Sequence, residues 1–154
     1  MKLFFVLALV IQATITFSAT PQDGGTYKII PKRSGLVLGL AGNSNNEGTP
    51  LIAQPDFSQA SQRFILHQTG PNVFELEDKG SGLYIIASYP SPSQALYTPG
   101  ATYHKFELFP VGSFYMIRAV SSVNFAMTLV PGSDINLQPI TGADNQLFYF
   151  CSSQ

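Results

Sequence analysis

The sequence repeats itself at a fixed interval. Phe64, Phe106 and Phe148 stand 42 residues apart, twice over, and each is followed two places later by another apolar residue. Self-similarity at a fixed period constrains architecture strongly, because it indicates one supersecondary unit that is used several times. Three such units account for residues 24–150. The chain is therefore predicted to hold a single domain built from three related units.

Each unit is predicted to consist of short strands. Apolar residues alternate in brief runs that Gly, Pro, Asn and Ser interrupt about every 8–12 positions, which is typical of an all-β fold. In the first unit, 36–40 is predicted to be the hairpin partner of 26–30. The predicted strands are 26–30, 36–40, 51–53 and 64–67, then 73–77, 83–87, 95–97 and 106–109, then 114–118, 125–129, 135–137 and 148–150.

Four strands in each of three units predict a β-trefoil. One four-stranded unit cannot bury its apolar face alone, whereas three units that close around a shared axis remove most exposed sheet edges. The expected fold is thus all-β, with three four-stranded repeats of about 42 residues and pseudo-threefold symmetry.

The first residues are expected to form a secretion signal. Lys2 is followed by an unbroken apolar run over 3–11, and small residues precede a possible cleavage site before Ala19. This run is shorter than the roughly 20 apolar residues that span a bilayer. We therefore expect a signal peptide at 1–18, no membrane insertion, and a secreted, extracellular β-trefoil domain over 19–154.

Composition argues against several classes of function. The formal net charge of −1 does not suit a run of phosphates, so nucleic acid is not an expected partner. Cys151 is the single cysteine, which excludes an intrachain disulfide and leaves stability to packing. His67 and His104 are far apart in the sequence, and no nucleophile motif accompanies them. We predict neither catalytic residues, nor a metal site, nor a cofactor.

Recurring motifs give the chain a family resemblance. It resembles the ricin-B-type β-trefoil lectins, in particular short secreted members of the fungal type, and the resemblance implies carbohydrate binding without catalysis, with glycans or glycoproteins as partners. The motifs in the first unit are Gly25-Thr26-Tyr27-Lys28-Ile29, Ser34-Gly35-Leu36, Gly48-Thr49 and Gln62-Arg63-Phe64. The later units supply Ser81-Gly82-Leu83, His104-Lys105-Phe106 and Asn145-Gln146-Leu147-Phe148.

The resemblance also implies which residues contact sugar. The carboxylate of the family's site falls on Gly39, Ile86 and Thr128, none of which is acidic. Its aromatic residue falls on an amide in the first and third units, and the third unit alone keeps the Asn-Gln pair. The implied carbohydrate-binding residues are Thr128, Gln138, Asn145, Gln146, Gln62, Gln54 and Tyr97, with the third unit as the main site.

Some of these residues have a structural interpretation as well. The repeated phenylalanines suit the barrel core, where each would bury 150–250 Å². The preceding Gln62 and Gln146 could bind loop backbone instead of sugar. Tyr89, Tyr97 and Tyr103 share the proline-rich second-unit loop, where they could stack on a sugar or cover the barrel mouth.

A second class of function fits a β-trefoil, because some fungal protease inhibitors without disulfides have this fold. In such proteins, exposed loops enter the active site of a protease. Lys32-Arg33 at the first predicted turn would suit a trypsin-like enzyme. Asn43, Asn45 and Asn46 in the next loop would suit an asparagine-directed protease. A secreted protease is therefore the alternative partner.

Overall fold

The computed structural model describes residues 19–153, so the predicted signal peptide lies outside the described residues. In this range no helix is long and apolar enough to cross a membrane. The described chain forms twelve strands: β1 Thr26–Pro31, β2 Val37–Leu40, β3 Leu51–Gln54, β4 Phe64–Gly70, β5 Val73–Asp78, β6 Tyr84–Ile86, β7 Ser93–Ala95, β8 Lys105–Val111, β9 Phe114–Ala119, β10 Phe125–Leu129, β11 Ile135–Pro139 and β12 Phe148–Ser152. It also forms four single-turn 3-10 helices: η1 Ala41–Asn43, η2 Ala60–Gln62, η3 Thr102–His104 and η4 Asp144–Gln146.

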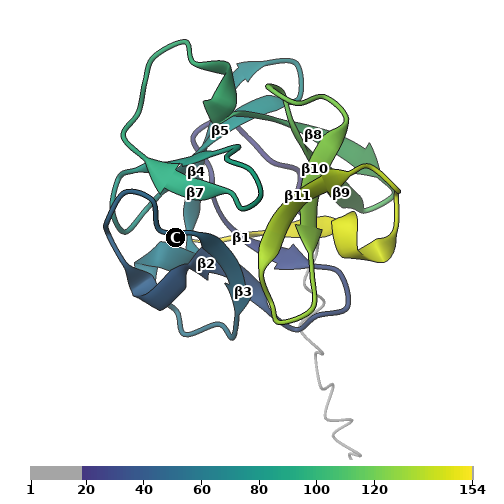
Figure 1. The fold of residues 1–154 in the computed structure, drawn as a ribbon, viewed down its shortest axis with the longest axis horizontal. Coiled ribbons are helices and arrows are strands. Elements are labelled where there is room, and N and C mark those ends of the chain that lie inside the picture. The colour runs from purple at the N-terminus through teal and green to yellow at the C-terminus, as the bar shows by residue number, and fades with distance from the viewer. Residues whose placement is uncertain (1–18, 154) are drawn as a thin grey trace, which may run out of the picture.

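Six of the strands close into a barrel. Around it, β1, β4, β5, β8, β9 and β12 each pair antiparallel with the next, and β12 returns to β1. The remaining strands pair as β2–β3, β6–β7 and β10–β11, one hairpin for each unit. Figure 1 shows the units as lobes around a common centre, with β2–β3 below, β7 at the left and β10–β11 at the right. The predicted β-trefoil is confirmed.

The repeated phenylalanines take equivalent places in the core. Phe64, Phe106 and Phe148 are fully buried. Each lies opposite another aromatic residue on the neighbouring barrel strand: Phe64 opposite Tyr27, Phe106 opposite Phe74, and Phe148 opposite Tyr115. Cross-strand aromatic pairs stabilise antiparallel sheet. The sequence period therefore marks one repeated packing contact, and the core role expected for these residues is confirmed.

The predicted hairpin between 26–30 and 36–40 is wrong in its pairing. β2 pairs with β3, while β1 pairs with β12 on one side and with β4 on the other. Because both edges of β1 belong to the barrel, β2 must turn away and find its partner in its own unit.

The third strand of the second unit is also displaced from its prediction. β7 spans Ser93–Ala95 instead of 95–97. The first unit fixes this register, because the Gly48 N–H donates to the Gln94 carbonyl and the buried Gln94 side chain donates to Ser44 and Asn46. These are contacts between units, so the local sequence pattern does not contain them.

The loops between hairpin strands join the units to one another. In each case a backbone N–H of one unit donates to a carbonyl of another, and together the contacts link all three units in a ring. The pairs are Gly48 to Gln94, Leu137 to Pro90 and Ala53 to Ser133, each at 2.8 Å.

Candidate functional site

In the first unit, the closing glutamine binds the loop that precedes it. The Oε1 atom of Gln62 accepts from the backbone N–H groups of Phe57 at 2.9 Å and Gln59 at 3.2 Å. Its Nε2 donates to the Pro55 carbonyl at 2.7 Å. The side chain is buried, so these bonds satisfy backbone groups that would be costly to leave unpaired.

In the third unit, Gln146 occupies the same place and makes the same kinds of bond. Its Oε1 accepts from the backbone N–H groups of Thr141 at 2.8 Å and Gly142 at 3.0 Å. Its Nε2 donates to the Pro139 carbonyl at 2.9 Å and to the Thr128 hydroxyl at 3.1 Å. The interpretation of the closing glutamines as loop-binding residues is confirmed. Direct sugar contact by Gln62, Gln146 or the buried Thr128 stays a prediction.

The first unit fills the position of the missing carboxylate with its own side chain. A Cβ atom placed on Gly39 would lie 2.3 Å from Nε2 of Gln54 and 2.9 Å from Cγ of Gln62. The Gln54 amide therefore lies directly over Gly39. Its Nε2 is buried and has no hydrogen-bond partner among the described residues. An amide that is turned inward in this way occupies the space that a sugar-binding carboxylate would need.

The second unit closes on His104 instead of glutamine. Its Nε2 accepts from the Thr98 N–H at 3.0 Å, which leaves the ring proton on the buried Nδ1 atom. Pro99, the residue after Thr98, stands at the place of Phe57 in the first unit and has no N–H to donate. Burial lowers the pKa of His104, and the nearby Glu75 carboxylate offsets this effect only in part.

Around His104, the second unit gathers aromatic rings and carboxylates. Tyr97 stacks on Tyr84 with ring centroids 4.5 Å apart, and its hydroxyl donates to the buried Glu75 at 3.2 Å. His67 contacts Glu77 at 2.8 Å. Burial, together with the charges of Glu77 and Glu75, raises the pKa of Tyr84 to about 12, so its hydroxyl stays protonated at neutral pH.

The three tyrosines of the second-unit loop do not all come together. Tyr97 and Tyr103 both pack on the ring of His104, at 5.4 and 4.7 Å between centroids. Tyr89 packs instead on Phe125 of the third unit. The loop thus presents aromatic rings at two different places.

The third unit presents free amides beside its closing glutamine. Asn145 is exposed, and its single hydrogen bond among the described residues is a long one of 3.4 Å to the Leu129 carbonyl. Gln138 is half-buried on β11, directly before the Pro139 carbonyl that Gln146 binds. Asn145 is thus next to Gln146 in the sequence, and Gln138 is next to the proline that Gln146 binds. An amide has donors and acceptors that can pair with neighbouring hydroxyl groups.

The residues of the alternative inhibitor hypothesis lie in exposed turns. Arg33 is 77% exposed in its side chain and has a positive φ of 59°, and it forms an ion pair with Asp144 at 3.1 Å. Lys32 binds the same carboxylate at 2.9 Å. The Asn43 side chain accepts from the Ser61 hydroxyl at 2.7 Å.

Metal-binding residues do not gather in the described part of the chain. Residues 19–153 contain no group of three or more His, Cys, Asp or Glu side chains placed to hold an ion. Cys151 is partly exposed on β12.

Comparison with known families identifies a family model that matches the chain. The family described as ricin-type beta-trefoil lectin domain-like matches residues 13–95, which is more than half of the chain. No curated protein matches the sequence.

Solved structures share the fold at low sequence identity. The designed 3-fold symmetric protein ThreeFoil superposes with a TM-score of 0.74 and 22% identity, over 84% of this chain and 99% of its own. A Polyporus squamosus lectin, bound to the epitope Neu5Aca2-6Galb1-4GlcNAc, gives 0.71 and 16%, over 85% of this chain and 50% of its own. The exo-beta-1,3-galactanase 1,3Gal43A from Clostridium thermocellum gives 0.75 and 18%, over 87% of this chain and 31% of its own.

Proposed function

This chain belongs to the ricin-type β-trefoil lectin domain-like family, and from that membership we propose that it is a carbohydrate-binding protein that acts without catalysis. Its partners are glycans or glycoproteins outside the cell. We assign the extracellular location because 1–18, with its apolar run over 3–11, is proposed to be a secretion signal.

The observation that carries the proposal is the arrangement of amides in the third unit. Gln146 uses both of its amide atoms to fix the loop that leads back from β11. Asn145 directly precedes Gln146, Gln138 directly precedes the Pro139 that Gln146 binds, and both amides have capacity for further hydrogen bonds. A binding group held by a rigid neighbour loses less entropy when a ligand arrives. We therefore place the sugar contact on Gln138 and Asn145, with Gln146 and Thr128 as their support.

The affinity of this site for sugar is limited because it has no carboxylate. Thr128 stands where the family has an acidic residue, and its hydroxyl is buried and bonded to Ala126 and Gln146. Hydrogen bonds to a charged group are about twice as strong as those between neutral groups. A neutral site should therefore bind a single sugar weakly, with Kd around 1 mM. Useful affinity would need several sites to bind one glycan together.

The first unit serves as an internal control for this proposal. Gln54 holds the place in the first unit that Gln138 holds in the third, but it lies over Gly39 with its Nε2 atom buried. Since that amide faces the protein, we propose that the first unit makes little contact with sugar.

A glycan array tests the proposal. The probe is the chain from residue 19 onward, compared with a Gln138→Ala/Asn145→Ala variant and with Gln54→Ala as the matched control. We expect binding by the parent and the control, and its loss in the double variant at an unchanged melting temperature. Gln146 is left intact because its replacement would release the loop. A folded parent protein that binds no glycan, either on the array or in solution at millimolar sugar, would contradict the proposal.

Protease inhibition is the second candidate, and the exposure of Arg33 favours it. Its basic side chain projects from the turn after β1, where a trypsin-like enzyme could reach it. Inhibition of trypsin by the parent chain, lost in Arg33→Ala, would support this function. Absence of inhibition at high protein concentration would reject it.

A further inference from the structure

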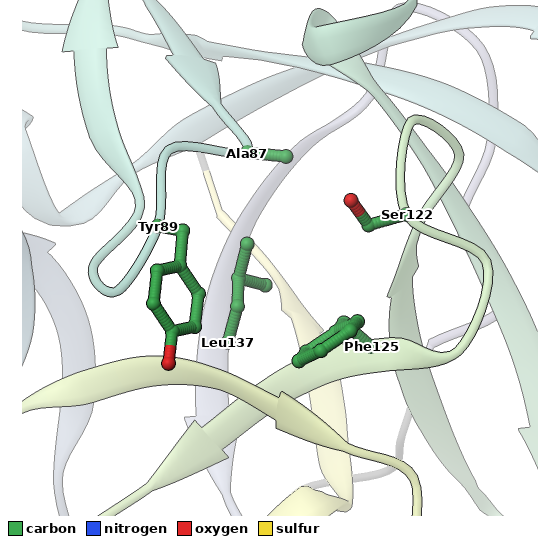
Figure 2. Close-up of a pocket in the computed structure, with 5 residues that line it drawn as sticks. All are labelled: Ala87, Tyr89, Ser122, Phe125 and Leu137. Carbon is green, nitrogen blue, oxygen red and sulfur yellow. The ribbon is translucent and has the colours of Figure 1, made fainter.

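A pocket lies between the second and third units, where Tyr89 packs on Phe125. Its volume is about 300 Å³, and its walls are Ala87, Tyr89, Ser122, Phe125 and Leu137. Figure 2 shows these side chains converging on one space from the segment after β6, the loop before β10, and β10 and β11 themselves. This volume is at the lower end of the range for small-molecule sites, so the pocket suits a ligand of about one ring.

The wall that carries Tyr89 is fixed by hydrogen bonds. Next to it, the Pro90 carbonyl accepts from the Leu137 N–H at 2.8 Å. The Ser88 hydroxyl donates to the Ser91 carbonyl at 2.6 Å, and the Ser91 hydroxyl donates to Asn136 at 3.2 Å. These bonds tie the segment both to itself and to β11. The backbone position of Tyr89 is therefore set before any ligand arrives.

Tyr89 combines a fixed backbone position with a highly exposed side chain. Its residue exposure is 77%, the highest among the large hydrophobic residues that the structure describes. Its ring meets Phe125 edge to face, with centroids 6.2 Å apart and planes at 81°. An aromatic face that the fold holds open to solvent offers apolar area to a ligand at low entropy cost.

The chemistry of the walls defines the ligand. Three walls are apolar, Tyr89 and Ser122 add hydroxyl groups, and none of the five lining side chains is charged. A charged ligand would lose its hydration here without gaining a counter-ion. A neutral ring with one apolar face and hydroxyl groups at its edge fits these walls.

We propose that this pocket is a second carbohydrate subsite, which takes one neutral sugar ring with its apolar face on Tyr89. The inference rests on the proposed function, because it assigns a further place for the same class of ligand. It shares no residue with the amide pair of the third unit. Leu137 of the pocket and Gln138 of that pair are neighbours on β11, but successive side chains of a strand point to opposite faces, so the two contacts are separate.

Titration of the isotope-labelled chain, followed by NMR, tests the subsite. The probes are neutral methyl hexosides, methyl N-acetylglucosaminide and the best neutral oligosaccharide from the array. We expect the amide signals of Ser122 and Leu137 to shift. Tyr89→Ala should weaken binding on the order of tenfold, and Tyr89→Phe should keep most of it because the ring remains. Tyr103→Ala, an exposed tyrosine outside the pocket, is the matched control and should bind as the parent does.

The outcomes separate this inference from the function on which it rests. If Gln138→Ala/Asn145→Ala abolishes binding while Tyr89→Ala does not weaken it, the chain binds sugar but the subsite is wrong. If phenol or indole shifts the pocket signals and no sugar does, the pocket takes apolar ligands and the subsite is again wrong. If no sugar binds anywhere, both proposals fall. Because Tyr89 is exposed, its replacement is not expected to unfold the protein, and thermal melting verifies this.

Discussion

The first and third units use the same device to close and differ in what surrounds it. Gln62 and Gln146 each accept two loop N–H groups and donate to a proline carbonyl at the equivalent place. Beside this shared frame, the first unit covers Gly39 with Gln54, whereas the third unit places Thr128 under Gln146. The comparison shows that the same hydrogen-bonded frame closes both units although the residues beside it differ.

The largest expected loss of stability comes from replacing the repeated core phenylalanines, and it tests whether they are equivalent in the first and third units. Phe64→Ala and Phe148→Ala each remove a fully buried ring, and each should lower the free energy of unfolding by about 3–5 kcal/mol. Urea denaturation measures both. If the two losses in free energy of unfolding differ by more than the spread between replicates, the repeated phenylalanines are not equivalent in the core.

A smaller effect is expected when the closing glutamines are removed. Gln62→Ala and Gln146→Ala leave part-buried loop hydrogen-bonding groups without their partners, which should cost about 1–3 kcal/mol each. The loss should be greater for Gln146, because it also binds Thr128. Equal losses in urea denaturation would show that the Thr128 contact contributes nothing, and the contrast between the units would then disappear.

The space over Gly39 gives a test that applies to the first unit alone. Gly39→Ala places a methyl group against Gln54 and Gln62, so it should destabilise the fold by about 1–3 kcal/mol. The double variant Gly39→Ala/Gln54→Ala should recover part of this loss, since the nearer contact is gone. If the double variant recovers no stability, the contact with the Gln54 side chain is not the cause of the loss in Gly39→Ala.

The smallest effect concerns the second unit, which closes on His104 where the other two units have glutamine. Burial lowers the pKa of His104 below its usual 6.5, so the unfolded chain takes up the proton first as the pH falls. The stability contributed by the neutral ring is then present above about pH 6.5 and is lost toward the lower pKa of the folded state. His104→Gln, which introduces the residue of the other units, should flatten this dependence between about pH 7.5 and pH 5. Urea denaturation at several pH values measures this. If the free energy of unfolding of the variant depends on pH as that of the parent does, other titrating groups cause the dependence.

The sequence predicted the repeated parts of the molecule and missed the contacts between repeats. The period of Phe64, Phe106 and Phe148 predicted the trefoil because equivalent residues occupy equivalent places in the core. The pairing of β2 and the register of β7 were missed, since a closed barrel and the Gln94 contacts determine them.

At the candidate site, the structure shows Asn145 exposed and Gln138 half-buried, and their contact with sugar stays a prediction. The inward position of Gln54 depends on the space that Gly39 leaves, which a pattern of residues along the chain does not reveal. The pocket at Tyr89 was missed because Phe125 reaches it from another unit.

The pairing of β1 with β12 has a consequence for synthesis of the protein. β1 leaves the ribosome early, yet the strand that covers one of its edges is the last of those described. Until β12 emerges, that edge is an open template for another nascent chain. Chains stalled before residue 148 should therefore remain sensitive to protease and prone to co-aggregate. Closure of this barrel is therefore expected to wait until β12 has left the ribosome.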